Sequence, residues 1–278
     1  MDPTAYTLAV QALLRLGRPD SRSHWLNYLD MGLTEADVPD LIRLATDHAD
    51  FDLNNPASWG PIHAWRALGQ LRAPAAVEPL LNEFEWFDET DHEWAFEEVP
   101  DVLAMIGPPA TDPVGRYIKD TARRDQARVF AANALPKIAE RFPDQRPACI
   151  EHLRQALEKG DQNEPDTNGF LVSDLLDLKA AEAAPAIEKA YAAGWVDRWI
   201  CGTWEDVRRE LEGLPPLPCT SLWDKMLADR QALSDKPQPL PPPAPKSIPH
   251  PRPRRSDRDR QRDQRKRQRQ ARKRGRRR

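Results

Sequence analysis

The chain has 278 residues, of which 40% are hydrophobic and 31% are charged, and its net charge is −3 at pH 7. That sum hides two opposed parts. Residues 1–235 carry 23 Lys and Arg against 41 Asp and Glu (23 − 41 = −18), whereas residues 236–278 carry 18 against 3 (18 − 3 = +15). No apolar run approaches the ~20 residues of a membrane span, and the first residues lack the pattern of a secretion signal. We therefore expect a cytoplasmic protein without membrane contact.

The first predicted elements are helices over residues 4–16 and 35–46, the second with Thr34 as its N-cap, and together they would form an N-terminal capping pair. Three cysteines, Cys149, Cys201 and Cys219, are far apart and odd in number. Their spacing predicts free thiols in a reducing compartment, with packing in the core as their role.

A plan of two helices joined by a turn then recurs along the chain. The predicted pairs are 64–69 with 76–81, 99–107 with 114–118, 127–141 with 147–157, and 170–178 with 185–191. Gly69 and Gly107 are expected to end the first helix of their pairs, and Pro39, Pro100 and Pro136 to kink helices. Residues 207–211 and 221–233 predict a C-terminal cap.

Equivalent apolar positions of the pairs are Leu68, Ile106, Ile138 and Leu175, at steps of 38, 32 and 37 residues. A period in the thirties that is built from paired helices is typical of an α-solenoid, in which each pair buries its apolar face only against its neighbours. The sequence thus predicts an all-α fold, a short solenoid of helix pairs over residues 1–235.

The segments Ala67–Leu68–Gly69, 76–81 and 105–108 resemble HEAT-repeat proteins, in particular the short type called phycobilisome-lyase HEAT-like. Segments 97–100, 175–178 and 202–207 are similar to a group of uncharacterised bacterial proteins of the same class. The resemblance covers roughly residues 5–213. It implies the HEAT-like solenoid fold, and it carries no common activity.

The last part of the chain is of a different kind. Residues 236–253 contain nine prolines, which predicts an extended polyproline-II linker. Residues 254–278 are rich in Arg and lack aromatic and large aliphatic side chains, which predicts a disordered basic tail that binds phosphate backbones without base stacking. The candidate nucleic-acid-binding residues are Arg254, Arg255, Arg265, Lys266, Arg267, Arg269, Arg272, Lys273, Arg274, Arg276, Arg277 and Arg278.

Candidate chemistry in the body is sparse. The acidic segment 88–93 could hold a divalent cation, but we favour an inter-repeat loop in which Asp91 caps the next helix. The pairs Glu97–Glu98 and Glu205–Asp206 are predicted to be solvated surface, because adjacent helix residues do not face each other. No motif predicts a catalytic residue, a metal or a cofactor, so the chain is predicted not to be an enzyme.

Aromatic side chains supply the candidate protein contacts. Exposed tryptophans could anchor a peptide, and buried ones would fill gaps between repeats, the state that we expect for most of them. His63 lies between two tryptophans and could serve as a general base or a stacking residue, although packing is the favoured interpretation. The candidate residues are Trp59, His63, Trp86, Trp94, Trp195 and Trp199.

The sequence thus favours a binding scaffold whose acidic body engages a basic or amphipathic protein through the second helix of each pair. The tail would contact RNA, DNA or a ribonucleoprotein. Two alternatives stay open. One is a lyase-like or chaperone-like protein that acts on a protein-bound ligand; the other is association of the tail with the acidic body, in the same or another copy. The sequence makes no prediction of the oligomeric state.

Overall fold

A computed structural model describes residues 6–20, 24–48, 52 and 54–215. The chain divides into two units, Met1–Cys219 and Thr220–Arg278, and the second lies wholly outside the described residues. The same is true of the helix predicted at 221–233, the proline-rich linker and the basic tail. The described residues form helices, turns and loops, and no strand occurs among them, so the predicted all-α class is confirmed for this part of the chain.

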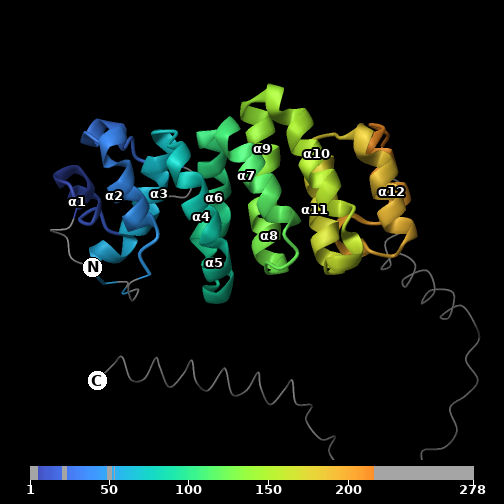
Figure 1. Ribbon diagram of the computed structural model, residues 1–278, viewed down its shortest axis with the longest axis horizontal. Helices are drawn as coiled ribbons and strands as arrows, with labels where there is room; N and C mark the ends of the chain where they lie inside the picture. The colour runs from blue at the N-terminus through green and yellow to red at the C-terminus, as the bar shows by residue number, and fades with distance from the viewer. Residues whose placement is uncertain (1–5, 21–23, 49–51, 53, 216–278) are drawn as a thin grey trace, which may run out of the picture. The chain divides into compact units, whose positions relative to one another are not determined.

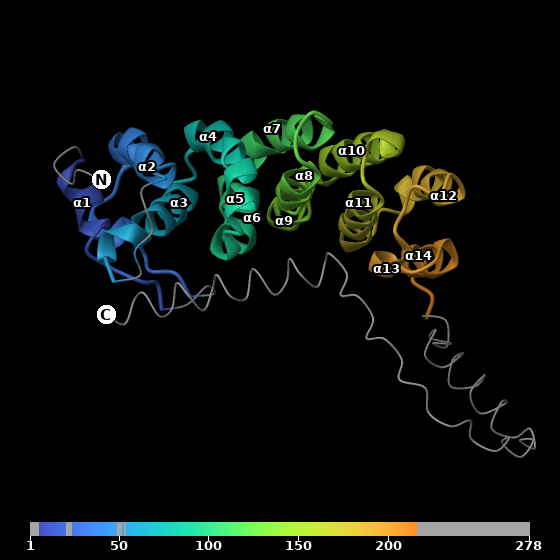
Figure 2. The ribbon, with the colours of Figure 1, turned by 90° about the horizontal axis from the view of Figure 1, so that it is seen from below.

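The main helices of the first unit lie in two rows (Figures 1 and 2). The first row consists of α3 (Gly60–Gln70), α6 (Glu93–Ile106), α9 (Ala134–Arg141), α11 (Pro165–Asp177) and α14 (Trp204–Leu211). The second row consists of α2 (Val38–Ala45), α4 (Val77–Asn82), α7 (Pro108–Lys119), α10 (Arg146–Leu157) and α12 (Ala184–Ala192). Within each row every helix contacts the next, and the two rows pack on each other. Outside the rows, the described residues also form the α-helices α1 (Leu8–Leu13), α5 (Phe84–Thr90), α8 (Asp125–Ala132) and α13 (Arg198–Cys201).

The core lies between the rows. All four predicted equivalent positions, Leu68, Ile106, Ile138 and Leu175, are buried, and each lies on or at the end of a first-row helix. Four second-row helices start from a 3-10 turn, which spans Glu35–Asp37 before α2, Pro74–Ala76 before α4, Pro143–Gln145 before α10 and Ala181–Ala183 before α12. The recurrence of the same entry turn and the same buried positions is what a sequence repeat produces when each copy folds alike.

Polar contacts between neighbouring pairs repeat with the same spacing. The ion pairs Arg116–Glu78, Lys137–Asp101 and Arg146–Glu182 join residues that are 38, 36 and 36 positions apart, with N–O distances of 2.7–2.8 Å. These pairs are largely exposed, so each contributes about 0–1 kcal/mol to stability. Their regular spacing shows that equivalent positions of successive pairs lie side by side.

Helix starts agree with the capping signals. Thr34 and Asp37 form a reciprocal capping box before α2, as predicted for Thr34. The sequence also places Thr203 three residues before Asp206, and these form the corresponding box at the start of α14. In both boxes the side chains supply acceptors to backbone N–H groups that have no partner within the helix.

Helix ends differ from the prediction at one of the two glycines. Gly107 ends α6 with φ 85°, as expected, but Gly69 lies inside α3 and packs against Val102 of α6. The helix ends instead at Gln70, followed by the C-cap Leu71 and by Arg72 in the left-handed conformation (φ 49°). Lys179 takes the same conformation after α11 (φ 50°). In both cases the amide of the residue that follows the left-handed one donates to a carbonyl in the last turn of the helix, from Ala73 to Leu68 and from Ala180 to Leu175. That bond satisfies a terminal carbonyl and makes up for the strain of a non-glycine residue.

Several predicted helices have other bounds, and those predicted at 99–107 and 114–118 begin at Glu93 and Pro108. The helix predicted at 4–16 is limited to α1, and the one predicted at 170–178 begins earlier, at Pro165. The single helix predicted at 127–141 is two helices, α8 and α9, with Asn133 between them. Pro136 has no N–H to donate to the carbonyl four residues before it, which removes the bond that would join the two segments. Pro100, by contrast, lies inside an unbroken α6.

Candidate binding groove

A groove of about 450 Å³ lies on the first row, across α6, α9 and α11. It is lined by Phe96, Glu97, Pro100, Asn133, Pro136, Lys137, Asp174 and Asp177. Apart from one lysine and one amide, the polar side chains on this list are carboxyl groups. The three helices belong to three successive pairs of the repeat, so the groove exists only where the pairs stack.

Asp174 is the unusual member of this set. It is 5% exposed, and its Oδ2 atom has no hydrogen-bond partner. Burial, together with the charge of Asp177 on the next turn of α11, raises the pKa of Asp174 well above its ordinary value. A carboxyl group that loses water without gaining donors favours the neutral form. The fold thus holds a carboxyl group in the groove with no donor to its buried Oδ2 atom.

The other side chains of the groove are better satisfied. Lys137 Nζ donates to Asp101 Oδ1 at 2.7 Å, so the lysine is already paired with a carboxylate. Phe96 stacks on Phe130, with ring centroids 3.6 Å apart and planes at 17°. Glu97 and Asp177 are exposed. The groove therefore has an aromatic wall, an acidic rim and a buried carboxyl group.

The predicted aromatic contacts fall into three groups. Trp59 is buried and packs edge-on against the half-buried Trp94, with centroids 5.9 Å apart. Trp86 and Trp195 are half-buried: Trp86 stacks on the His48 ring at 4.1 Å, and Trp195 covers Gly160, where a Cβ atom would meet its ring at 2.5 Å. Trp199 alone among the six candidates is strongly exposed, at 87%. Burial was the expected state for most of the tryptophans. Of those that the structure describes, Trp59 and Trp65 are buried, Trp199 is exposed and the rest are half-buried.

His63 is enclosed in the core and does not form a surface site with Trp59, contrary to its place among the candidate protein contacts. Its Nε2 atom donates to the Gly17 carbonyl at 2.8 Å, and Nδ1 therefore accepts from the Tyr28 hydroxyl at 2.7 Å. Burial lowers the pKa of His63, and the charge of Arg66 lowers it further, although the hydrogen bond to Gly17 acts in the opposite direction. Both ring nitrogens are occupied, so this neutral imidazole ties the segment before α2 to α3.

The expectation for Glu97–Glu98 is wrong for Glu98. Glu97 is exposed, but Glu98 is 2% exposed and accepts two hydrogen bonds from Arg66, from Nε at 2.7 Å and from Nη2 at 2.6 Å. A third comes from Trp65 Nε1 at 3.1 Å. Adjacent helix residues point about 100° apart, which puts one glutamate in solvent and the other against α3. An arginine inside the apolar stripe 64–69 was the available signal of a buried partner.

Glu205 and Asp206 behave as predicted surface residues. Glu205 pairs with Arg208 at 2.9 Å, and Asp206 completes the capping box with Thr203. These local bonds lower the pKa of both carboxyl groups, so the pair lacks the separated pKa values that acid–base catalysis requires.

The acidic segment 88–93 is mostly helical. Its first three residues belong to α5, and Asp91 ends that helix in the left-handed conformation. The cap of α6 is therefore His92, whose Nδ1 atom accepts from the Ala95 amide at 3.2 Å, and not Asp91 as predicted. Asp88 is paired with Arg124. Among the described residues no group of His, Cys, Asp and Glu is arranged to hold a metal ion.

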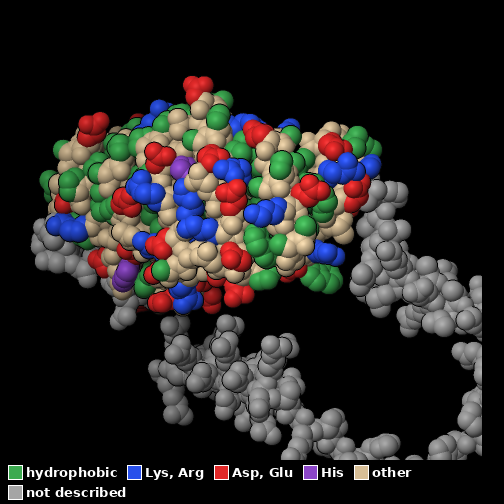
Figure 3. Space-filling view, turned by 45° about the vertical axis from the view of Figure 1, so that its right-hand side comes forward, with side chains coloured by type: hydrophobic (Ala, Val, Ile, Leu, Met, Phe, Trp, Pro, Cys, Tyr) green, Lys and Arg blue, Asp and Glu red, His purple; other side chains and the backbone are tan. Residues whose placement is uncertain are grey.

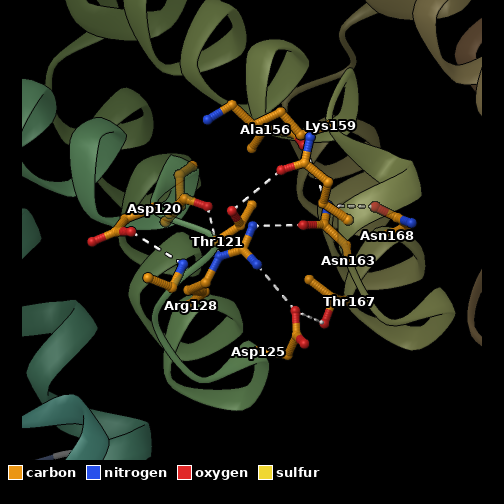
Figure 4. Close-up of polar contacts among 12 residues, drawn as sticks. Asp120, Thr121, Asp125, Arg128, Ala156, Lys159, Asn163, Thr167 and Asn168 are labelled. Atoms are coloured by element: carbon orange, nitrogen blue, oxygen red, sulfur yellow. Dashed lines mark hydrogen bonds and ion pairs between the residues drawn. The ribbon is translucent and has the colours of Figure 1, made fainter.

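A buried polar network between α8 and α11 was not predicted (Figure 4). Arg128, 2% exposed, donates to the Ile118 carbonyl, to Asp125 Oδ1 and to Asn163 Oδ1 at 2.7–3.0 Å. Asn163 donates to Asn168 Oδ1 at 2.8 Å, and Asn168 donates to the carbonyls of Gly160 and Trp195, both at 2.9 Å. Every guanidinium nitrogen of Arg128 has an acceptor, so this network fixes a loop and offers no open site.

The cysteines that the structure describes are free thiols. Cys149 is buried and Cys201 half-buried, and burial raises the pKa of each to about 11. The expected packing role is thus confirmed for Cys149, and Cys219 lies outside the described residues. None of the described helices combines the length and the apolar character that crossing a membrane requires.

The basic-tail candidates, Arg254 to Arg278, also lie outside the described residues. Asp174 was not predicted as a site residue, because nothing in the sequence around it marks it. Comparison of the chain with protein-family models, curated proteins and solved structures finds no match. Function is therefore inferred from the groove, the repeat and the charge distribution.

Proposed function

We propose that the chain is a non-enzymatic scaffold that binds other macromolecules. Its helical body would bind a basic segment of a protein partner, and its basic tail would contact RNA, DNA or a ribonucleoprotein. We further propose that the two rows of helices are an α-solenoid of the HEAT type. The regular 36–38-residue spacing of the exposed ion pairs supports this assignment, because solenoid repeats contact only their neighbours and offer extended binding surfaces.

The observation that carries the proposal is the groove on the first row, whose lining includes the buried Asp174 with no hydrogen-bond partner at its Oδ2 atom. It lies on the first helix of each pair, not on the second helix that the sequence suggested. Charge over the rest of the body is less selective: Figure 3 shows a face on which acidic and basic side chains are interspersed. A basic partner would therefore be selected by the groove, with the acidic excess of the body assisting its approach.

The proposal excludes a catalytic role for the residues that could carry one. His63 has both nitrogens engaged, and Glu98 is held by Arg66 and Trp65. The cysteine thiols have raised pKa values, which leaves them un-ionised and unreactive at neutral pH. These groups pack in the interior and hold neighbouring helices in place.

The tail is tested by binding of labelled single-stranded RNA and duplex DNA, measured by fluorescence anisotropy over a salt series. The full chain is compared with a full-length variant in which the Arg and Lys residues of 254–278 are replaced by Gln. We expect tail-dependent binding that weakens steeply with salt, since neutralised phosphates release counterions. Equal affinity of the two proteins would refute the tail contact. Salt-sensitive self-association of the full chain in sedimentation, without nucleic-acid binding, would favour association of the tail with the body.

A further inference from the structure

Hydrogen-bond acceptors outnumber donors in the groove, whose side-chain donors are the Lys137 ammonium and the Asn133 amide. Asp174 Oδ2 is buried without a partner, and the rim carries Glu97 and Asp177. The one cationic side chain on the lining, Lys137, donates to Asp101. Pro100, which also lines the groove, has no N–H and so adds no donor. A ligand that satisfies Asp174 must bring a hydrogen-bond donor, and the acidic lining favours a positive charge on it.

The side chains that line the groove do not suit a metal ion. Within the described residues no group of three or more His, Cys, Asp and Glu is placed to hold one. The groove also presents an aromatic ring and two prolines, which are not metal ligands. An organic cation with a flat, weakly hydrated face fits the combination of an aromatic wall and scattered acceptors.

We propose that the groove binds an arginine side chain of an extended segment of a partner protein, with the guanidinium between Asp174 and the ring of Phe96. This inference rests on the scaffold function proposed above and names what its groove recognises. The volume of about 450 Å³ accommodates a side chain of that size together with part of the adjoining backbone. The run of the groove across α6, α9 and α11 suits a peptide that crosses the helices rather than one that follows a single helix.

Arginine is favoured over lysine for a geometric reason. A guanidinium has five donors in one plane and stacks on aromatic rings, whereas an ammonium is a compact, strongly hydrated charge. Here the two features that a guanidinium would contact come from different helices, the Asp174 carboxyl from α11 and the Phe96 ring from α6. The outer face of Phe96 is the stacking surface, since its other face is covered by Phe130.

Binding should be coupled to a proton. Burial and the charge of Asp177 raise the pKa of Asp174. The other charged groups of the groove are Glu97, Asp177 and the paired Lys137, and α13 contributes the Cys201 thiol, whose pKa Asp174 helps to raise. A guanidinium next to Asp174 favours its ionised form, so the carboxyl group loses its proton as the arginine enters. Proton release on binding is a signature that non-specific attraction to exposed carboxylates does not produce.

The test uses the full chain and three fluorescein-labelled peptides of one sequence, which differ at a central residue that is Arg, Lys or citrulline, the neutral analogue of Arg. Affinity is measured by anisotropy, and proton release by calorimetry in two buffers of different ionisation enthalpy. We expect the Arg peptide to bind about tenfold or more tightly than the citrulline peptide, with Lys between them. In D174N the advantage of Arg over citrulline and the proton release should both disappear.

Two further variants serve as controls. D144N makes the same chemical change at an exposed aspartate in the turn before α10 and should leave binding unchanged. Phe96→Leu keeps the charges but removes the aromatic ring, so it should narrow the difference in affinity between the Arg and Lys peptides. Far-UV circular dichroism and thermal unfolding of each variant establish that the fold is retained.

The outcomes separate the two proposals. If the Arg and Lys peptides bind equally and D174N binds both as the wild type does, the arginine site is overturned while a basic-protein scaffold stands. If none of the peptides binds below about 1 mM, the site and the body's part of the proposed function both fail, and the tail experiment remains independent of them. The site is supported if D174N loses both the preference for Arg and the proton release while D144N keeps them.

Discussion

Removing one partner of the Arg66–Glu98 pair should be among the most damaging single changes in the body. Both side chains are 2% exposed, and Glu98 accepts bonds from Arg66 and from Trp65. Glu98→Ala leaves a buried guanidinium without the carboxylate that accepts two of its hydrogen bonds. Breaking a buried pair in this way costs about 3–5 kcal/mol, a large part of the about 5–15 kcal/mol by which domains are stable.

The double variant gives the sharper result. Arg66→Met with Glu98→Leu removes both charges and fills the space with apolar atoms, so it should lose less stability than either single alanine substitution. The free energy of unfolding is measured from urea transitions followed by far-UV circular dichroism, because Trp65 lies against the pair and would distort a fluorescence signal. The matched control is Glu78→Ala, which breaks the Arg116 pair, 60–64% exposed, and should cost about 0–1 kcal/mol. A loss below about 1 kcal/mol for Glu98→Ala, or additive losses in the double variant, would refute the reasoning.

Three further predictions concern pH and backbone strain. Because the pKa of Asp174 is raised in the folded state, the stability that this group contributes to the wild type falls as pH rises above 3.8. Asp174→Asn should therefore become more stable than the wild type with rising pH, by about 1.4 kcal/mol per unit of difference between the folded and unfolded pKa. Urea midpoints over a pH series check this, and a stability difference that shrinks with rising pH contradicts it. Burial lowers the pKa of His63 and of His92 in the folded state, so in the Asp174→Asn background stability should fall as pH drops from 6.5 to about 5, the range in which the unfolded chain takes up protons first; a flat profile would show that neither imidazole is held neutral. Lys179→Gly should raise thermal stability by about 0.5–1 kcal/mol because Lys179 has φ 50°, whereas Gly194→Ala (φ 73°, with open space around the added carbon) should lower it by a similar amount; equal signs would show that the left-handed conformation is not the cause.

Local sequence rules accounted for much of the fold. Helix periodicity, the capping residue Thr34 and the stop at Gly107 act over a few residues, so they can be read without knowledge of the rest of the chain. The repeat of apolar positions from Leu68 to Leu175 likewise predicted which residues are buried, because equivalent positions of stacked helices meet the same neighbours. The position of the break before Pro136 is an intermediate case: the missing N–H predicts a disturbance, and the structure shows its size.

What the sequence by itself determined is therefore a helical body with a repeat in the thirties and an opposite charge at each end of the chain. Only the tertiary structure decided which polar groups are buried. Asp174 and Asp177 lie one turn apart on α11, and yet the first is enclosed in a groove and the second is exposed. Glu97 and Glu98 divide in the same way. The burial of a carboxyl group depends on which helix of another repeat packs over it, about 32–38 residues away in the chain, and a local pattern does not carry that information.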